Sequence, residues 1–274
     1  MWNLKLLPRV ATFYWGGKNL PFLRYATITS FIRYNPDWNV KFYYPKHPSL
    51  NHSWESFEQK YTDKWDNYFD KVFKLGIETV AVDFEDLGVS NEMSEVHKSD
   101  LLRWKLLSEG GLWADMDILF FAPMDNLLIN NKDNEDADTV VSVCKYGHSI
   151  GFLMGSVDNE YFSNIFKQAI IDYIPSQYQC IGSTLLNRMY PHLDAEDGVL
   201  NVGMSAVYYY DAHNMGKIYE AGLSPKEVPG AIGCHWYAGC RQAGDFLLKT
   251  NGGKDKLPNT VIGNLIKEYG SSKV

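Results

Sequence analysis

The stretch that decides the fold is Ser99–Phe121, which reads SDLLRWKLLSEGGLWADMDILFF. Its first half repeats leucines at helical spacing, and polar residues fill the opposite face. Gly110 and Gly111 end the helix, because glycine accepts the left-handed conformation that a helix C-cap needs. The rest of the stretch is apolar except for Asp115 and Asp117, as in a buried strand. Because Asp is a poor strand residue, two of them in such a run indicate a functional requirement, and metal ligation supplies one.

A second Asp-x-Asp, Asp136–Asp138, provides an internal comparison within the same chain. It follows the polar residues 130–135, a stretch that has no strand pattern and is typical of a solvated loop. The context of the two motifs therefore differs. We expect a cation site at Asp115 and Asp117 and only a polar surface at the second motif.

The chemistry of such a site follows from its ligands. Residues two apart on a strand share a face, so Asp115 and Asp117 point the same way if the strand persists between them. Hard divalent cations take oxygen ligands, and Mn²⁺ also accepts an imidazole. A Mn²⁺ or Mg²⁺ ion held there, with Asp117 as the primary ligand, can bind a diphosphate. As a Lewis acid it offsets the negative charge that grows on the diphosphate when a sugar leaves it.

The segment from Ser99 to Asp117 resembles the signature of the DXD-motif sugar transferases. This family includes capsular-polysaccharide enzymes, fungal mannosyltransferases and the large glucosylating bacterial toxins. Residues 8–17, 147–155 and 232–239 resemble further family segments in the right order, so the likeness covers most of residues 8–240. It implies an α/β, GT-A-like single domain, with a Rossmann-like nucleotide-binding half and a mixed central sheet flanked by helices.

The resemblance also implies roles for the residues around the motif. Asp100 and Arg103 would hydrogen-bond hydroxyls of the donor sugar, whereas a simple surface ion pair at i and i+3 is the alternative. Asp115 would bind the metal through water or contact the ribose, and Asp117 would bind the metal directly. His235 would be the third protein ligand, with a packed, hydrogen-bonded histidine as the alternative.

Four further residues would lie on the donor side. By resemblance, Trp113 would sit against the donor, and Trp15, followed by Gly16, would stack on the nucleobase. Core packing is the alternative for both tryptophans. Gly151 would allow the backbone to approach the sugar, or else it marks a strand bulge. The family places acceptor-side contacts around residues 182–184.

Composition excludes other classes of function. The 274-residue chain is 45% hydrophobic and 22% charged, as is ordinary for a globular protein, and carries a formal net charge of −7. A nucleic-acid partner is not expected, because it would require a basic surface. The cysteines lack Cys-x-x-Cys spacing, which argues against a zinc site (Cys144, Cys180, Cys234 and Cys240). No apolar run approaches the ~20 residues of a transmembrane segment, and a cytoplasmic location is expected.

Along the chain, a strand–helix–strand opening predicts an α/β crossover with a nucleotide at the strand ends. We expect one domain over residues 1–252 and a loosely held tail over residues 253–274. The remaining expected elements are a strand at 79–84, helices at 160–173 and 183–190, and a strand at 206–210.

These patterns favour an enzyme, a metal-dependent hexosyltransferase of polysaccharide biosynthesis. It would move a sugar from a nucleotide diphosphate sugar to a glycan or other hydroxyl acceptor, with a UDP-sugar favoured over a GDP-sugar. Retention of configuration is implied by the resemblance alone. One alternative is a haloacid-dehalogenase-like phosphatase, although its motif requires Thr or Val where Leu119 stands. The other is a carbohydrate- or metal-binding domain without turnover.

Overall fold

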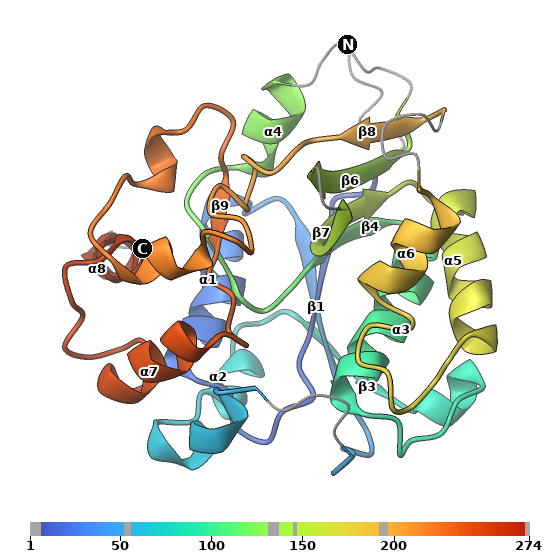
Figure 1. Ribbon diagram of the computed structural model, residues 1–274, viewed down its shortest axis with the longest axis horizontal. Helices are drawn as coiled ribbons and strands as arrows, with labels where there is room; N and C mark the ends of the chain where they lie inside the picture. The colour runs from blue at the N-terminus through green and yellow to red at the C-terminus, as the bar shows by residue number, and fades with distance from the viewer. Residues whose placement is uncertain (1–6, 52–55, 131–136, 145–146, 192–196, 272–274) are drawn as a thin grey trace.

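The structure is a computed structural model and describes residues 7–51, 56–130, 137–144, 147–191 and 197–271. Its centre is a seven-stranded sheet with the strand order β3-β2-β1-β4-β7-β6-β8 (Figure 1). The strands of this sheet are β1 (Val10–Tyr14), β2 (Asn39–Pro45), β3 (Glu78–Val82), β4 (Gly111–Ala114), β6 (Thr139–Cys144), β7 (Gly147–Gly155) and β8 (Val199–Asn201).

The sheet is mixed. β1 pairs in parallel with β2 and β4, and β2 pairs in parallel with β3. β7 runs antiparallel to both β4 and β6. The first crossover passes through α1 (Phe22–Tyr34), which confirms the strand–helix–strand opening. The carboxyl ends of β1 and β4 therefore lie next to each other, and ligands of open α/β sheets bind beyond such strand ends.

Helices cover both faces of the sheet. On one side lie α3 (Glu95–Glu109), α5 (Glu160–Ile171) and α6 (Ser183–Met189), and on the other lies α1 (Figure 1). Successive β1 side chains separate accordingly: Phe13 packs against α1, and Tyr14 packs in the cluster that includes α3. Because both faces are buried, the parallel strands read as nearly continuous apolar runs.

The chain turns at the Asp-x-Asp motif. β4 ends at Ala114, and β5 (Ile118–Phe120) begins only after the second aspartate. β5 pairs antiparallel with β9 (Gly233–His235) in a separate two-stranded sheet. The expectation of one continuous strand through the motif is therefore wrong. The two aspartates occupy the turn between two sheets, which agrees with the depletion of Asp in strands.

The C-terminal part also differs from the expectation. Residues 261–271, expected in a loosely held tail, form α8 (Val261–Ser271), whose buried side chains pack with those of α7 (Arg241–Lys249) and of Trp236. The apolar residues of 261–271 recur at helical spacing, and burying them stabilises the helix despite the polar residues between them. Residues 206–210 are not a strand. Tyr208 N–H donates to Met204 O, which closes a turn there.

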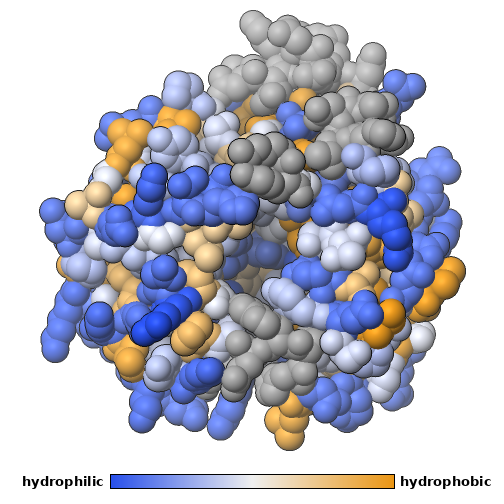
Figure 2. Space-filling model, in the orientation of Figure 1, coloured by the Kyte–Doolittle hydropathy of each residue, from blue (hydrophilic) through white to orange (hydrophobic). Residues whose placement is uncertain are grey.

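The remaining elements are short: η1 (Gln59–Lys64), α2 (Phe69–Val72), η2 (Phe84–Leu87), α4 (Met124–Asn130), η3 (Met215–Tyr219) and η4 (Pro225–Glu227). Within the described ranges, no helix combines the length and the apolar character that crossing a membrane requires. The face in Figure 2 is mostly hydrophilic, with hydrophobic residues scattered over it and a hollow near its centre.

Candidate functional site

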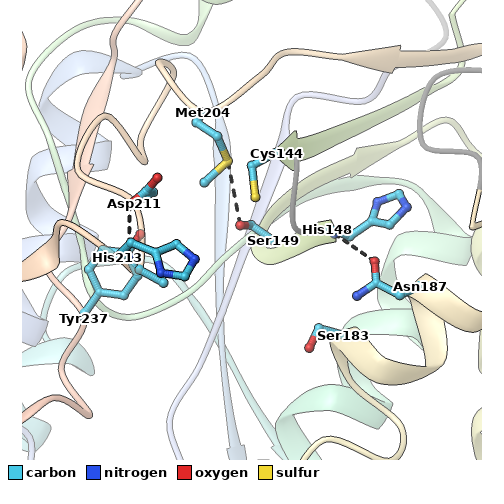
Figure 3. Close-up of a pocket in the computed structure, with 11 residues that line it drawn as sticks. Cys144, His148, Ser149, Ser183, Asn187, Met204, Asp211, His213 and Tyr237 are labelled. Atoms are coloured by element: carbon cyan, nitrogen blue, oxygen red, sulfur yellow. Dashed lines mark hydrogen bonds between the residues drawn. The ribbon is translucent and has the colours of Figure 1, made fainter.

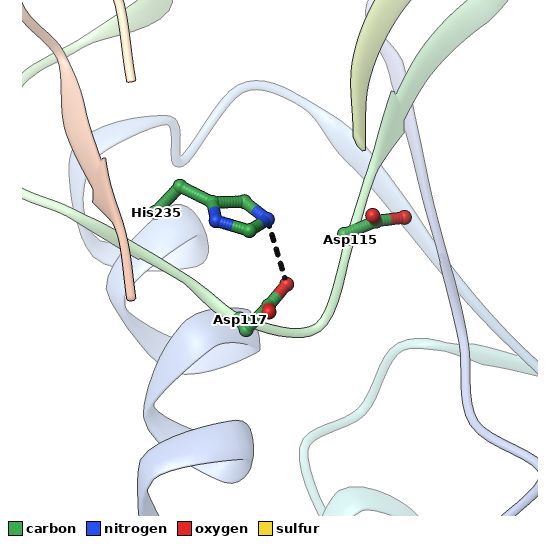
Figure 4. Close-up of side chains that lie close together, drawn as sticks. All are labelled: Asp115, Asp117 and His235. Carbon is green, nitrogen blue, oxygen red and sulfur yellow. Dashed lines mark ion pairs between the residues drawn. The ribbon is translucent and has the colours of Figure 1, made fainter. Parts of the chain in front are cut away.

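Asp115, Asp117 and His235 come together where the two sheets meet (Figure 4). Each offers one ligand atom, and these atoms lie within 4.8 Å of one another. Two carboxylates and an imidazole are the ligand set that suits Mn²⁺. Among the described residues no other group of His, Cys, Asp and Glu side chains meets this spacing. The three residues named as metal ligands from the sequence are thus neighbours in the structure.

Side chains from α3 and β4 hold Asp115. Its Oδ1 accepts hydrogen bonds from Arg103 Nη2 (3.0 Å) and Trp113 Nε1 (2.8 Å). Its backbone N–H donates to Gly151 O on β7 (2.8 Å). Two donors on one oxygen fix the orientation of the carboxylate, so Oδ2 is the atom left to face a ligand.

Gly151 has to be glycine because of this arrangement. A Cβ added there would lie 2.5 Å from Asp115 Oδ2 and 2.7 Å from the hydroxyl oxygen of Tyr208, closer than real side chains approach. The site therefore requires a bare backbone at this point of β7. The glycine thus leaves room for Asp115 and Tyr208, and its approach to a sugar stays a prediction.

Asp100 and Arg103 form a buried pair on α3 rather than a surface one. Arg103 Nη1 donates to Asp100 Oδ1 at 2.5 Å, and the two side chains are only 4% and 5% exposed. Burial raises the pKa of Asp100, and the attraction of Arg103 only partly opposes it. Asp100 Oδ2 and Arg103 Nε are buried and have no hydrogen-bond partner among the described residues. Buried polar atoms without partners are rare, so the two atoms call for an explanation beyond packing.

Asp117 is held from the opposite side of the site, by the segment around β9. His235 Nε2 lies 3.1 Å from its Oδ1, and Ala238 N–H donates to its Oδ2 at 2.9 Å. Trp236 N–H donates to its backbone carbonyl at 2.8 Å. Burial alone would raise the pKa of Asp117, but His235, Arg24 and the Ala238 N–H together lower it. Asp117 is therefore an anion, as a metal ligand must be.

His235 is anchored as part of β9. Its N–H donates to Val207 O at 2.7 Å, and its Nδ1 accepts from Tyr237 N–H at 3.3 Å. The ring lies beside those of Tyr208 and Tyr237, with centroids 4.9 and 4.3 Å away. The imidazole is fixed with Nε2 toward two carboxylates, which suits a metal ligand. The backbone hydrogen bonds of His235 also agree with the alternative, a packed, hydrogen-bonded histidine.

Trp113 and Trp15, both expected on the donor side, lie in different surroundings. Trp113 is 1% exposed and serves the site through its Nε1–H, so its ring packs while its nitrogen orients Asp115. The Arg24 guanidinium lies 4.0 Å from the Trp15 ring centroid and covers one face of it. Gly16 lies against Glu95, whose carboxylate a Cβ would strike. Within the described residues, neither Trp15 nor Gly16 forms a hydrogen bond with the Asp115–Asp117–His235 cluster, and Trp15 Nε1 donates to Asn19 O at 3.2 Å instead.

Sequence reasoning missed Tyr208 and Arg24. Arg24 is buried on α1, donates through Nε to Glu58 Oε1 at 2.7 Å and through Nη2 to Oε2, and lowers the pKa of Asp117 from a distance. Tyr208 is 3% exposed and ends beside Asp115. No local motif marks either residue, because both reach the site through contacts with residues far away in the sequence. Of the second Asp-x-Asp, Asp136 is outside the described residues, and Asp138 is no member of the cluster.

Residues of β7, of α6 and of the segment after β9 line a cavity of about 210 Å³ (Figure 3). Ser149, Ser183, Asn187, Met204, Asp211 and Tyr237 are among the residues that line it. Ser149 is two residues from Gly151 on β7, and Tyr237 is two residues from His235. Ser183 follows Gly182, where a Cβ would lie 2.6 Å from Asp100 Oδ2. Ser149 and Tyr237 thus lie near residues of the metal-ligand site, and Ser183 lies near Asp100.

Solved structures share the fold. The glycosyltransferase GlyE of Streptococcus pneumoniae TIGR4 superposes with a TM-score of 0.54 at 11% identity, over 97% of this chain and 61% of that one. The chain therefore spans less than two thirds of GlyE. The PaToxG glycosyltransferase (TM-score 0.48, 14% identity, 69% of this chain and 71% of that one) and the galactosyltransferase LgtC (0.44, 12%, 97% of both) are also similar. The GlyE likeness confirms the expected GT-A-like architecture.

Comparison of the sequence with family models gives a match, whereas comparison with curated proteins gives none. Residues 83–213 match the model of the capsular polysaccharide synthesis protein family. The match spans just under half of the chain and includes Asp100, Arg103, Asp115 and Asp117. It confirms the resemblance to capsular-polysaccharide enzymes that the segment from Ser99 to Asp117 carries.

Proposed function

We propose that this protein is a metal-dependent glycosyltransferase that uses a nucleotide diphosphate sugar, with UDP-sugars favoured over GDP-sugars. The observation that carries the proposal is the meeting of Asp115, Asp117 and His235 at the junction of the two sheets of a glycosyltransferase fold. The ligand set suits Mn²⁺ or Mg²⁺, and the neighbouring residues supply donors and acceptors for a polyhydroxylated ligand.

The cation would be held by one oxygen each of Asp115 and Asp117 and by His235 Nε2. When bound, it would neutralise negative charge on the leaving diphosphate as a Lewis acid. The protein prepares this site in advance: Arg103 and Trp113 fix Asp115, and the Ala238 N–H fixes Asp117. Preorganised ligands need no reorganisation when charge develops, which is the largest contribution that a protein makes to such chemistry.

Asp100 and Arg103 would bind the donor sugar. Asp100 Oδ2 can accept a hydrogen bond from one hydroxyl, and Arg103 Nε can donate to another. Both atoms are already desolvated in the folded protein, so a ligand that lacks the matching hydroxyls would leave them unpaired. Sites of this kind reject such analogues strongly.

The cavity lined by Ser149 and Tyr237 is where we place the acceptor. Its volume of about 210 Å³ lies below the range of ~300–1,000 Å³ of drug-sized ligand sites, which suits one sugar ring of a glycan better than several. The Tyr237 ring offers an apolar face, and Ser149, Ser183 and Asp211 offer hydrogen-bonding groups. This position would bring an acceptor hydroxyl next to the donor.

The alternatives explain fewer of these features. A haloacid-dehalogenase-like phosphatase would require Thr or Val where Leu119 stands, and the chain shares its fold with a glycosyltransferase instead. A domain that bound only a metal would require no buried, unpaired Asp100 Oδ2 beside Arg103, and the activity test below separates a sugar-binding domain without turnover from an enzyme. Residues of both sheets form the site, so we treat the described chain as one catalytic unit.

The direct test is nucleoside diphosphate release from a panel of UDP- and GDP-sugars, with Mn²⁺ or with EDTA. We expect release from at least one donor that requires Mn²⁺ and falls at least ~100-fold in Asp117→Asn, because a ligand of the cation is lost. Asp138→Asn is the matched control from the second Asp-x-Asp and should retain full activity. The absence of both release and Mn²⁺-dependent stabilisation by any nucleoside diphosphate would rule out the proposal.

A further inference from the structure

The local sequence around Tyr208 does not predict the position of this residue. It follows Val207, whose carbonyl accepts the His235 N–H, and its own N–H donates to Met204 O. Its ring lies beside the imidazole of His235, with the centroids 4.9 Å apart. The backbone that holds the third metal ligand therefore also holds this phenol in place.

The hydroxyl of Tyr208 is buried and unpaired. The residue is 3% exposed, and its Oη has no hydrogen-bond partner among the described residues. More than nine in ten buried polar groups in proteins are hydrogen-bonded, and burying one without a partner costs free energy. A protein that only needed to fill this space would do better with phenylalanine. The hydroxyl therefore points to a partner that binds there.

The position of the hydroxyl indicates what that partner is. A Cβ added at Gly151 would lie 2.7 Å from Tyr208 Oη and 2.5 Å from Asp115 Oδ2, so both oxygens stand over the same glycine. Asp115 is one of the three residues that can hold the cation. A group bound to that cation would thus come close to the phenol.

The phenol can act there only as a neutral group. A tyrosine hydroxyl has an ordinary pKa of about 10, so it is protonated at neutral pH. It therefore keeps its proton and donates a hydrogen bond. Among the parts of a nucleotide sugar, the anionic oxygens of the diphosphate are the strongest acceptors, and the cation holds them at this place.

We propose that Tyr208 Oη donates a hydrogen bond to an anionic oxygen of the donor diphosphate bound at the Asp115–Asp117–His235 site. This inference rests on the proposed function and adds a residue of the ligand-binding machinery outside the Asp-x-Asp segment. A neutral donor preorganised beside the phosphate would also stabilise the charge that develops on it as the sugar leaves.

The test compares Tyr208→Phe with the wild-type protein. Mn²⁺ affinity is measured with the metal alone, and nucleotide affinity with UDP and GDP in saturating Mn²⁺, both by calorimetry. We expect Mn²⁺ affinity within twofold of wild type and about tenfold weaker binding of whichever nucleotide the wild-type protein prefers. The melting temperature without ligand should be equal or higher, because an unpaired buried hydroxyl is removed.

Tyr210→Phe is the matched control. Tyr210 is also buried, but its hydroxyl donates to Leu223 O at 2.8 Å. Its loss should lower the melting temperature and leave both affinities unchanged.

Two results would overturn the inference. Unchanged nucleotide affinity in Tyr208→Phe would mean that the hydroxyl contacts no diphosphate. An equal loss of Mn²⁺ and nucleotide affinity would mean that Tyr208 positions Asp115 instead. A wild-type protein that binds neither nucleotide in Mn²⁺ would refute the proposed function itself, and the inference with it, and this outcome is visible before any variant is made.

Discussion

Asp115 and Asp117 are separated by one residue, yet two different parts of the molecule hold them. Asp115 is fixed by side chains: Arg103 and Trp113 both donate to its Oδ1. Asp117 is fixed largely by the backbone of the β9 segment, through the N–H groups of Trp236 and Ala238. The Asp115 side chain remains 28% exposed, whereas that of Asp117 is 13% exposed.

The comparison shows how the site divides its tasks. Side chains orient the more open carboxylate, so its geometry depends on a buried charge network that substitution can break. Backbone groups orient the more buried carboxylate, so no single side chain controls it apart from His235. A buried arginine lies near each carboxylate. Arg103 forms an ion pair with Asp115, whereas Arg24 pairs with Glu58 and lowers the pKa of Asp117 through space.

Arg103→Met should have the largest effect on stability. It removes the cation between Asp100 and Asp115 and leaves a buried carboxylate uncompensated, which costs about 3–5 kcal/mol in comparable buried pairs. Urea denaturation would measure the loss in unfolding free energy. Arg24→Met, which breaks the buried pair with Glu58, should lose a similar amount but keep Asp115 in place. If Arg103→Met matched the wild-type protein in stability, the side-chain account of Asp115 would be wrong.

Trp113→Phe tests the second donor on Asp115 with less disruption. It keeps an aromatic ring and removes the Nε1–H, so Asp115 would rely on Arg103 alone. Removing a partner that orients a metal ligand typically costs ~10–100-fold in metal affinity. The control is Trp104→Phe, because Trp104 is equally buried on α3 but donates to Ile181 O at 2.7 Å. Equal Mn²⁺ affinities in the two variants, measured by calorimetry, would contradict the assigned role.

Ser149→Leu tests the cavity independently of the Asp115–Asp117–His235 cluster. The larger side chain would fill part of the 210 Å³ space without touching Asp115 or Asp117. We expect Mn²⁺-dependent nucleotide binding within twofold of wild type and at least ~10-fold slower transfer to any acceptor that the wild-type protein glycosylates. Transfer at the wild-type rate would remove the cavity from the acceptor site.

Substitution of the surface carboxylate Asp83 should have the smallest effect on stability, in contrast to substitutions around the buried carboxylates. Hydrogen bonds from Asn91, then from Lys46, lower the pKa of Asp83 to about 2, against an unfolded value of about 3.9. A lowered folded pKa contributes stability that is present above pH ~3.9 and is lost as the pH falls toward 2. Asp83→Asn should therefore flatten the acid decline of unfolding free energy in this window, because it lowers the unfolding free energy slightly at pH 7 and leaves it unchanged near pH 2. An unchanged acid decline would show that Asp83 is not linked to folding.

The same division explains how much of the site the sequence could predict. Asp100, Arg103, Trp113 and Asp115 lie within one continuous segment of the chain, so the resemblance of that segment to the family signature indicated that they act together. The segment that holds Asp117 is more than 110 residues away. Backbone hydrogen bonds place it there, and these leave no mark on residue types, which is why Tyr208 and the Ala238 N–H were missed.

The errors in the fold have similar causes. The run from Leu112 to Phe121 has the composition of one strand, and only the pairing of β5 with β9 shows that it is two. The segment 261–271 was expected to be loose because glycine, serine and lysine surround it, but its apolar residues pack against η3, in the cluster that also includes α7. In both cases a distant partner decides the structure, and local propensity does not.

Direct titration of the protein with Mn²⁺, followed by the electron paramagnetic resonance signal of the free ion, tests the central claim most closely. The account predicts one tight Mn²⁺ per chain in the wild-type protein and in Asp138→Asn, and at least ~100-fold weaker binding in Asp117→Asn. Equal Mn²⁺ binding by wild type and Asp117→Asn would contradict it, because the cation would then lie elsewhere than between Asp115, Asp117 and His235.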